Sequence, residues 1–440
     1  MSNLIIKNKK LKPFKTSITV SGDKSISIRW VLFSSLASGV SNAHNLLLSE
    51  DVIAAINTIK KLGIKAKVKK NICTIYGKGI DGYSYKNLTL DAKNSGTLGR
   101  LILGLIINTN KKIKLIGDKS LSKRDFKRIA EPLKKFGANI ILHKNKTLPL
   151  VINNSKKLTP IKYFETRGSA QCKSSVIFAG MRAPGTTIIK AKKSRNHTEL
   201  LCKYLKLPIT IQNRKKYDLI KIKTVKKIKP LNYNIPSDIS SSSFFIALTA
   251  LTNNSKLIIK KVNINKSRIG IVTILRKMGV KISFLNKKNY KGEEIGDIEI
   301  ISPKKIKSIN CPTSLNSGAI DEFLVIFLVA AKANGTSYFK NLSELNQKES
   351  PRLKIGSKIL NMMGIKTLTT NSSIKIYGNP GLKINKKIII KNYLKDHRIF
   401  MTSVVAALSF GGEWRIHDKE SVETSFPSFM KTLKKIVQIK

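Results

Sequence analysis

The chain has 440 residues, of which 41% are hydrophobic, so it is long enough for two domains that each bury a core of their own. Its 26 glycines and 13 prolines follow no short period, which excludes a fibrous repeat, and its four cysteines form no Cys-x-x-Cys pair, which excludes a disulfide framework. The 83 basic residues against 25 acidic ones give a net charge of +58.

Such a charge is typical of nucleic-acid binding, but here the lysines are spread along the whole chain and no aromatic stacking motif lies among them. We therefore interpret the charge as a coding bias and expect no nucleic-acid partner. The first fifteen residues contain no continuous apolar segment, so we expect no secretory signal. The longest apolar runs, Leu101–Ile107 and Phe323–Ala331, are too short to span a bilayer, so we expect a cytoplasmic protein without membrane contact.

One pattern recurs along the chain: an amphipathic helix, a glycine and an alternating strand. It is centred on Gly63, Gly137, Gly279 and Gly364, with a degenerate copy near Pro208 and a truncated copy at 429–440. Glycine just after a helix suits the left-handed C′ position. A mostly small or apolar helix, a turn and a strand precede each copy. The sequence therefore predicts six units, each of the order strand, helix, strand, helix, strand, strand.

The sixth unit lacks closing strands, whereas two strand-like runs at the N-terminus, Leu4–Lys7 and Lys15–Val20, belong to no unit. The simplest interpretation is that the N-terminal segment completes the C-terminal half. Residues 1–22 and 239–440 would then form a discontinuous lobe, and residues 23–238 the second lobe. Because the chain would cross between the lobes twice, we expect a hinge and an active-site cleft between them.

The motifs lie at the starts of apolar helices or in loops after strands. In SGDKSISIR, Lys24 and Ser25 stand at a helix start with Arg29 one turn later, which is typical of a phosphate site. Similar polar helix starts or loops are NSGTLGR (94–100), GDKSLSKR (117–124), GSAQCKSS (168–175) and SRNHTE (194–199). For each motif taken singly, a helix cap or a turn is an equally good explanation.

The C-terminal half adds carboxylates to further basic groups. AIDEFL contains Asp321, ELNQKESPR contains Lys348, Glu349 and Arg352, and KDHRIFM contains Asp396 and Arg398. Such groups on loops that face one cleft would suit proton transfer on an anionic substrate, although Asp321 and Asp396 are also well placed as helix caps. Arginine is scarce beside lysine, so its retention in these motifs indicates planar recognition of phosphate and carboxylate.

Taken together, the motifs resemble the 5-enolpyruvylshikimate-3-phosphate synthase family, in its bacterial second class. The matching strings run in order from Ser21 to Phe429 and include SGDKSIS-R, NSGT, SAQ-KS, SR-HTE, P-DISS, IDE, KES, DHRI and TSFP. The resemblance implies an α/β, two-lobed enolpyruvyl transferase fold, with six βαβαββ repeats arranged three per lobe as an inside-out α/β barrel. It implies transfer of the enolpyruvyl group of phosphoenolpyruvate to the 5-hydroxyl of shikimate 3-phosphate in the shikimate pathway. It also implies a monomer that needs no metal or organic cofactor.

The resemblance also implies roles for individual residues. Lys24 would contact both substrates, Asp321 would accept the proton of the attacking hydroxyl, and Glu349 would protonate the methylene carbon. Shikimate 3-phosphate would be bound by Ser25, Arg29, Ser169, Ala170, Gln171, Arg195, Asp321 and Lys348. Phosphoenolpyruvate would be bound by Gly96, Arg124, Gln171, Arg352 and Arg398. The family's glycine at position 96 leaves room for glyphosate, so sensitivity to glyphosate is expected.

Some positions depart from the family pattern, among them Lys93, Asn346, Pro351 and Thr424. Most flank the expected contacts and do not remove them, although Pro351 fixes the backbone geometry beside Arg352. The nearest alternative is the sister transferase that acts on UDP-N-acetylglucosamine. It is disfavoured because that family has Lys-Asn in place of Lys24-Ser25 and a reactive cysteine in the loop that corresponds to Lys119–Arg124, which has none. A basic nucleic-acid-binding protein is the alternative from another class.

Overall fold

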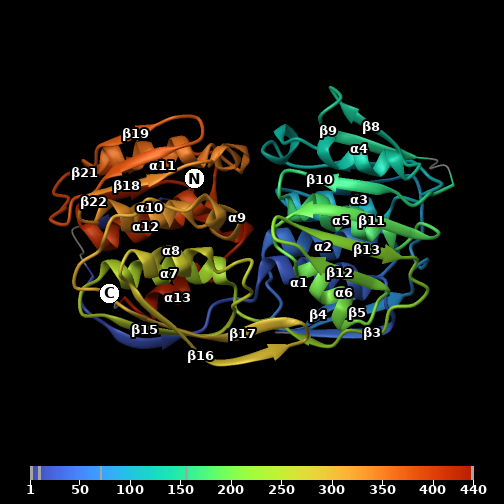
Figure 1. Ribbon diagram of the computed structural model, residues 1–440, viewed down its shortest axis with the longest axis horizontal. Coiled ribbons are helices and arrows are strands. Elements are labelled where there is room, and N and C mark those ends of the chain that lie inside the picture. The colour runs from blue at the N-terminus through green and yellow to red at the C-terminus, as the bar shows by residue number, and fades with distance from the viewer. Residues whose placement is uncertain (1–2, 8–10, 70–71, 154–156, 438–440) are drawn as a thin grey trace. The chain divides into compact units, whose positions relative to one another are not determined.

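The computed structural model describes residues 3–7, 11–69, 72–153 and 157–437 (Figure 1). It separates the chain into two compact units. The terminal unit comprises Met1–Ser21, Pro236–Asn289 and Glu294–Lys440, and the central unit comprises Gly22–Ile235 and Tyr290–Glu293. The sequence predicts lobe boundaries after residues 22 and 238, which lie within three residues of the observed ones. It does not predict that residues 290–293 belong to the central unit. The last three residues of the truncated repeat copy at 429–440 lie outside the described residues.

The central unit contains three repeats, drawn from blue to green in Figure 1. Its elements are α1 (Lys24–Ser35), β3 (Ser38–His44), α2 (Glu50–Lys61), β4 (Lys65–Lys69), β5 (Ile72–Lys78), β6 (Leu88–Asp91), α3 (Gly96–Leu105), β7 (Ile113–Ile116), η1 (Leu121–Lys123), α4 (Lys127–Lys135), β8 (Asn139–His143), β9 (Thr147–Asn153), β10 (Lys162–Glu165), α5 (Ala170–Gly180), β11 (Thr186–Lys192), α6 (His197–Tyr204), β12 (Ile209–Asn213), β13 (Tyr217–Lys223) and β14 (Tyr233–Asn234).

The described strands of this unit form sheets of the orders β14-β3-β5-β4, β6-β7-β9-β8 and β10-β11-β13-β12. Each sheet joins a parallel pair to an antiparallel hairpin, as the βαβαββ order requires. The first sheet is closed by the end of the unit, because β14 pairs with Ala43 and His44 of β3. Helices α1, α3 and α5 are buried along nearly their whole length, whereas the strands alternate between buried and exposed residues. The helices therefore lie inside and the sheets outside.

The terminal unit contains the other three repeats and both ends of the chain. Its elements are β1 (Leu4–Lys7), β2 (Lys15–Ile18), α7 (Ile239–Leu251), β15 (Lys256–Asn263), α8 (Gly270–Lys277), β16 (Lys281–Tyr290), β17 (Glu293–Ile301), η2 (Thr313–Leu315), α9 (Asn316–Ala319), α10 (Phe323–Ala331), β18 (Thr336–Phe339), η3 (Ser343–Gln347), α11 (Arg352–Met362), β19 (Thr367–Thr369), β20 (Ile374–Tyr377), β21 (Lys387–Ile390), α12 (His397–Phe410), β22 (Glu413–Ile416), η4 (Lys419–Thr424) and α13 (Phe429–Lys434).

The two N-terminal strands lie in different sheets of the terminal unit. Strand β2 runs parallel to β15 with Lys15 opposite Lys256, and β1 runs antiparallel to β22 with Leu4 opposite Ile416. The described strands form sheets of the orders β16-β17-β15-β2, β18-β20-β19 and β1-β22-β21. In the fifth repeat two isolated parallel bridges, from Lys307 to Asn334 and from Asn310 to Tyr338, stand where the sequence predicts a first strand. Pro312 lies two residues after Asn310 and has no N–H with which to extend the ladder.

The helix ends follow the predicted pattern. Gly63, Gly137, Gly279 and Gly364 have φ values of 83°, 106°, 92° and 87°, so the prediction of a left-handed C′ residue is confirmed at all four. In the degenerate copy near Pro208 the same position, after α6, is taken by Lys206 with φ 55°. The repeat geometry is therefore kept at that position without glycine.

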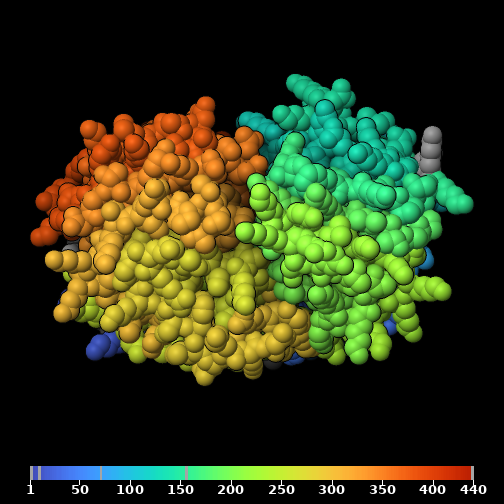
Figure 2. Space-filling view, viewed as in Figure 1, coloured from blue at the N-terminus to red at the C-terminus, as the bar shows by residue number. Residues whose placement is uncertain are grey.

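Strands β16 and β17 form a hairpin whose two-residue turn is Lys291 and Gly292. Both have positive φ, 52° and 87°, as a tight hairpin turn between twisted strands requires. Most side chains of the second half of β16 are exposed, and they form part of the yellow-gold surface in Figure 2. The tip of this hairpin, residues 290–293, belongs to the central unit. Among the described residues, no helix combines the length and the apolar character needed to cross a membrane.

Candidate active site

The first motif forms the start of α1. Asp23 caps this helix, because its Oδ1 accepts a hydrogen bond of 2.9 Å from the N–H of Ile26. Lys24 and Ser25 are therefore the first helical residues, as predicted. The Lys24 Nζ lies 2.9 Å from the Oδ2 of Asp51, at the start of α2, and both side chains are largely buried. Asp51 is not among the site residues expected from the sequence, since an acidic residue in a first helical turn is common and gives no specific signal.

Arg29 lies one turn after Ser25 and is 3% exposed. Its Nη1 donates to the carbonyl oxygen of Ser25 at 3.0 Å, while its Nε donates to Thr198 Oγ1 at 2.7 Å and its Nη2 to Ser174 Oγ at 3.2 Å. Burial lowers the pKa of Arg29 to about 10, and nearby carboxylates oppose that shift. The group therefore stays cationic at neutral pH, held in one orientation by three helices.

Two guanidinium groups converge on the N-terminus of α3. A Cβ atom at Gly96 would lie 3.0 Å from Nη1 of Arg124 and 3.1 Å from Nη1 of Arg100. Arg124 is oriented by Asn94, whose Oδ1 accepts from its Nη2 at 3.0 Å. Two cations beside the free N–H groups of a helix start form an anion site. From the sequence, Gly96 and Arg124 are expected at this site, whereas Arg100 is expected only as one of the motif arginines that recognise phosphate or carboxylate, because only the fold brings it beside Arg124.

The helix α5 places a further predicted residue beside this anion site. Gln171 accepts a hydrogen bond from Arg100 Nη1 and donates one of 3.0 Å to Thr97 Oγ1. Ser169 caps α5 by accepting from the N–H of Cys172 at 3.3 Å, and Ala170 is the first residue of that helix. Arg195 is half-buried, and its charge contributes to lowering the pKa of Arg29.

The predicted residues of the terminal unit gather around Asp321. Its Oδ1 lies 3.0 Å from Lys348 Nζ and 3.5 Å from Arg352 Nη1. Its backbone carbonyl oxygen accepts a hydrogen bond of 2.6 Å from Arg398 Nη1. Asp321 is not a helix cap: the residue before α10 is Glu322, whose side chain makes no cap bond. The carboxylate of Asp321 thus binds the side chains of Lys348 and Arg352 instead of capping a helix.

Arg352 connects Glu349 to Asp396. Its Nη2 lies 2.5 Å from Glu349 Oε2, and its Nε lies 2.8 Å from Asp396 Oδ2. Burial works against the charge of this guanidinium, but Asp396, Glu349 and Asp321 together raise its pKa above the ordinary value. Burial likewise disfavours ionised Asp396, yet Arg352 outweighs burial and lowers the pKa of that carboxyl. The pair is therefore ionised at neutral pH.

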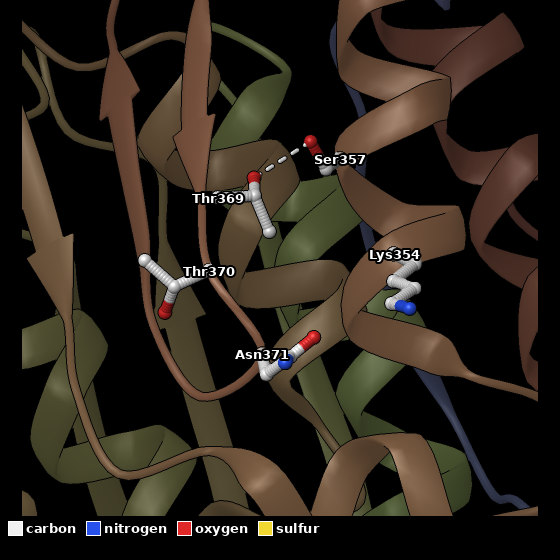
Figure 3. A pocket seen from close by; sticks show the side chains of 5 residues that line it. All are labelled: Lys354, Ser357, Thr369, Thr370 and Asn371. Carbon is white, nitrogen blue, oxygen red and sulfur yellow. Dashed lines mark hydrogen bonds between the residues drawn. The ribbon is translucent and has the colours of Figure 1, made fainter.

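A separate groove of about 480 Å³ lies on the terminal unit and is shown in Figure 3. It is lined by Lys354, Ser357, Thr369, Thr370 and Asn371, and the Thr369 hydroxyl donates to Ser357 at 2.8 Å. None of these residues belongs to the predicted site. With one lysine among neutral polar groups, the groove lacks the paired cations of the clusters described above.

Each unit therefore carries a cluster of buried cations, one with an anion site at a helix start and the other with three carboxylates, those of Asp321, Glu349 and Asp396. Such clusters are typical of an enzyme that acts on phosphorylated or carboxylated small molecules. The structure is similar to that of the enolpyruvyl transferase NikO from Streptomyces tendae, with a TM-score of 0.75, 15% identity and coverage of 99% and 97% of the two chains. The fold is therefore the two-lobed enolpyruvyl transferase fold, which confirms the predicted fold class.

More similar proteins identify the family. The structure of EPSP synthase from Acinetobacter baumannii superimposes with a TM-score of 0.86 at 32% identity, covering 99% of this chain and 98% of the other. The family model "EPSP synthase (3-phosphoshikimate 1-carboxyvinyltransferase)" matches residues 8–433. Relatives named 3-phosphoshikimate 1-carboxyvinyltransferase include one from Petrotoga mobilis, 34% identical with 96% and 97% of the chains covered, and one from Ruthia magnifica, 37% identical with 95% and 94% covered. The chain belongs to the EPSP synthase family.

Proposed function

We propose that this chain transfers the enolpyruvyl group of phosphoenolpyruvate to the 5-hydroxyl of shikimate 3-phosphate and releases inorganic phosphate. Membership of the EPSP synthase family carries the choice of reaction. The observation that supports it in the structure is the Asp321 cluster, where a carboxylate and a neighbouring glutamate are held by Lys348 and Arg352. Both units contribute residues to the proposed reaction.

The proposed contacts to shikimate 3-phosphate come mainly from α1 and α5. Lys24, Ser25 and Arg29 supply two cations and a hydroxyl at the start of α1. The start of α5 and the loop before α6 supply Ser169, Ala170, Gln171 and Arg195. Asp321 and Lys348 complete the set from the terminal unit. The helix starts contribute N–H groups that favour a phosphate, and the arginine forks favour a phosphate or a carboxylate.

Phosphoenolpyruvate is assigned to the second set of cations, with Lys24 shared by both substrates. Gly96, Arg124 and Gln171 hold it at the start of α3, where the lack of a side chain at Gly96 leaves space beside two guanidinium groups. Arg352 and Arg398 hold it from the terminal unit. Because both substrates are polyanions, these cations offset the repulsion that opposes their approach.

Two proton transfers accompany the proposed addition. Asp321 accepts the proton of the 5-hydroxyl as the oxygen bonds to C2 of phosphoenolpyruvate, and Glu349 gives a proton to the methylene carbon C3. This step gives a tetrahedral intermediate. Loss of a proton from C3 and breakage of the bond between C2 and the phosphate oxygen then form the enol ether and release phosphate. Lys348 orients the Asp321 carboxylate, and Arg352 orients that of Glu349.

Phosphate release from phosphoenolpyruvate tests the proposal. We expect release with shikimate 3-phosphate and none with UDP-N-acetylglucosamine, without any added metal or organic cofactor. Absence of release with shikimate 3-phosphate at every enzyme concentration would rule out the proposed reaction. Salt-sensitive binding of DNA or RNA without turnover would favour the nucleic-acid alternative. We further propose a monomer in the cytoplasm, as the family resemblance implies; light scattering on the purified chain tests the oligomeric state.

A further inference from the structure

Three consecutive residues at the start of α6 bind three different segments of the central unit. His197 Nδ1 lies 2.6 Å from Glu293 Oε1 at the hairpin tip. Thr198 Oγ1 accepts the Nε hydrogen bond of Arg29 at 2.7 Å. Glu199 Oε1 lies 2.6 Å from Lys173 Nζ of α5. These residues form the HTE part of the SRNHTE motif, of which the proposed function uses only Arg195.

The hairpin tip is closely packed against α6. A Cβ atom at Gly292 would lie 2.8 Å from the backbone oxygen of Leu200, so only glycine fits there. The Lys291 ammonium lies 5.8 Å, 5.6 Å and 5.6 Å from the ring centres of Tyr204, Tyr233 and Tyr290. The tip therefore contacts this eight-residue helix at both of its ends, at His197 and at Tyr204.

The pair of His197 and Glu293 is almost completely buried, with exposures of 2% and 3%. Between this pair and Arg29 the structure encloses a cavity of only about 10 Å³, which is close to the volume that one water molecule needs. The Glu293 charge also acts to raise the pKa of Arg29 against the effect of burial. Arg29 and the buried pair therefore line the same small cavity.

We propose that His197 and Glu293 are positioning residues for the binding of shikimate 3-phosphate. Glu293 holds His197, which fixes the first turn of α6, and Thr198 in that turn orients Arg29. The argument rests on the proposed function, in which Arg29 contacts shikimate 3-phosphate. If the first turn of α6 shifts, Arg29 loses the acceptor of its Nε–H and keeps only its bonds to Ser25 and Ser174, so its fork is less firmly oriented. The phosphoenolpyruvate contacts on α3 use none of these bonds.

Replacement of Glu293 by Gln tests the proposal, with Glu294→Gln as the matched control. Glu294 is the next residue of β17, half-buried, and has the same charge. For Glu293→Gln we expect the dissociation constant of shikimate 3-phosphate, measured by calorimetric titration, to rise about five- to tenfold, with the KM for phosphoenolpyruvate changed less than about twofold. Glu294→Gln is expected to leave both values unchanged. A change of equal size for both substrates would overturn the proposal.

Two further variants separate positioning from loss of stability. Lys291→Met removes the contacts of the tip with the three tyrosine rings and keeps His197 and Glu293 themselves, so it should weaken binding of shikimate 3-phosphate alone, by a smaller factor. In a double-mutant cycle, Thr198→Val and Glu293→Gln should have less than additive effects, because both act through Arg29. Fully additive effects, or an unchanged dissociation constant in every variant, would overturn the proposal. A wild-type chain that does not bind shikimate 3-phosphate would instead overturn the proposed function.

Discussion

Arg352 and Asp396 make a two-point contact: Arg352 Nε donates to Asp396 Oδ2 at 2.8 Å, and Nη2 donates to Oδ1 at 3.1 Å. Asp396 Oδ1 also caps α12 by accepting from the N–H of Arg398 at 2.9 Å. The buried carboxylate of Asp396 thus orients the side chain of Arg352 and the backbone of Arg398, both of which are proposed to bind phosphoenolpyruvate. Because two hydrogen bonds join the guanidinium to the carboxylate, this contact is both stronger and more specific in orientation than a single bond.

Asp396→Asn should lower the stability of the chain in a pH-dependent way. An asparagine keeps a helix cap but leaves the buried Arg352 charge with fewer partners, so we expect a loss of about 3 kcal/mol near neutral pH. The pKa of Asp396 is lower in the folded chain than its ordinary value of 3.8. The ionised group therefore stabilises the folded chain above that value, and this contribution disappears as the pH falls toward the folded-state pKa. The difference in melting temperature between wild type and variant should be largest near pH 7 and should shrink below about pH 4.

Glu349→Gln should reduce turnover far more than binding. Glutamine still reaches Arg352 but has no acidic proton to give, so kcat is expected to fall about 10²- to 10⁴-fold. The dissociation constant of shikimate 3-phosphate should change less than about threefold. Glu344→Gln, at an exposed position of the preceding η3 turn, is the control and should keep wild-type kcat. An unchanged kcat in Glu349→Gln would remove Glu349 from the proposed mechanism. The same assay applies to Asp321→Asn, for which we expect a loss of similar size.

Gly96→Ala should act on phosphoenolpyruvate. The new Cβ would lie 3.0 Å from Arg124 and 3.1 Å from Arg100, so both guanidinium groups must move by a few tenths of an ångström. We expect the KM for phosphoenolpyruvate to rise about tenfold, with the dissociation constant of shikimate 3-phosphate nearly unchanged. Sensitivity to glyphosate should fall in the same variant, as measured by inhibition of phosphate release. Gly381→Ala, where a Cβ would meet nothing closer than 3.5 Å, is the control.

Lys173→Met should be among the more destabilising substitutions in the central unit. Lys173 and Glu199 have side-chain exposures of 0% and 3% and lie 2.6 Å apart. Removal of one partner leaves the other buried charge unpaired, which costs about 3–5 kcal/mol. The double variant Lys173→Met/Glu199→Leu should recover much of that loss, because neither charge remains. Thermal and urea unfolding of the single and double variants measure this; a double variant less stable than Lys173→Met would contradict it.

Much of the local structure is predictable from short stretches of sequence. The four glycines after helices are left-handed, and Asp23, Ser95, Ser169 and Asp396 cap helices at the starts of the motifs. These features depend on the steric freedom of glycine and on bonds between neighbours in sequence. The local sequence around Asp321 also allows a helix cap, but that interpretation is wrong. In the folded unit its carboxylate binds Lys348 and Arg352. A cap and a catalytic carboxylate have the same local sequence signature.

The sequence by itself determined the repeat, the helix ends and the family, since each depends on residue type and spacing along the chain. The tertiary structure decided which charged groups lie together. It places Arg100 and Arg124 side by side at Gly96, and it pairs Asp51 with Lys24 and Glu293 with His197. These pairs join residues that lie between 24 and 96 positions apart. No periodicity or local propensity specifies such a contact, because a carboxylate is bound by whichever cation the packing of helices and sheets places within about 3 Å of it.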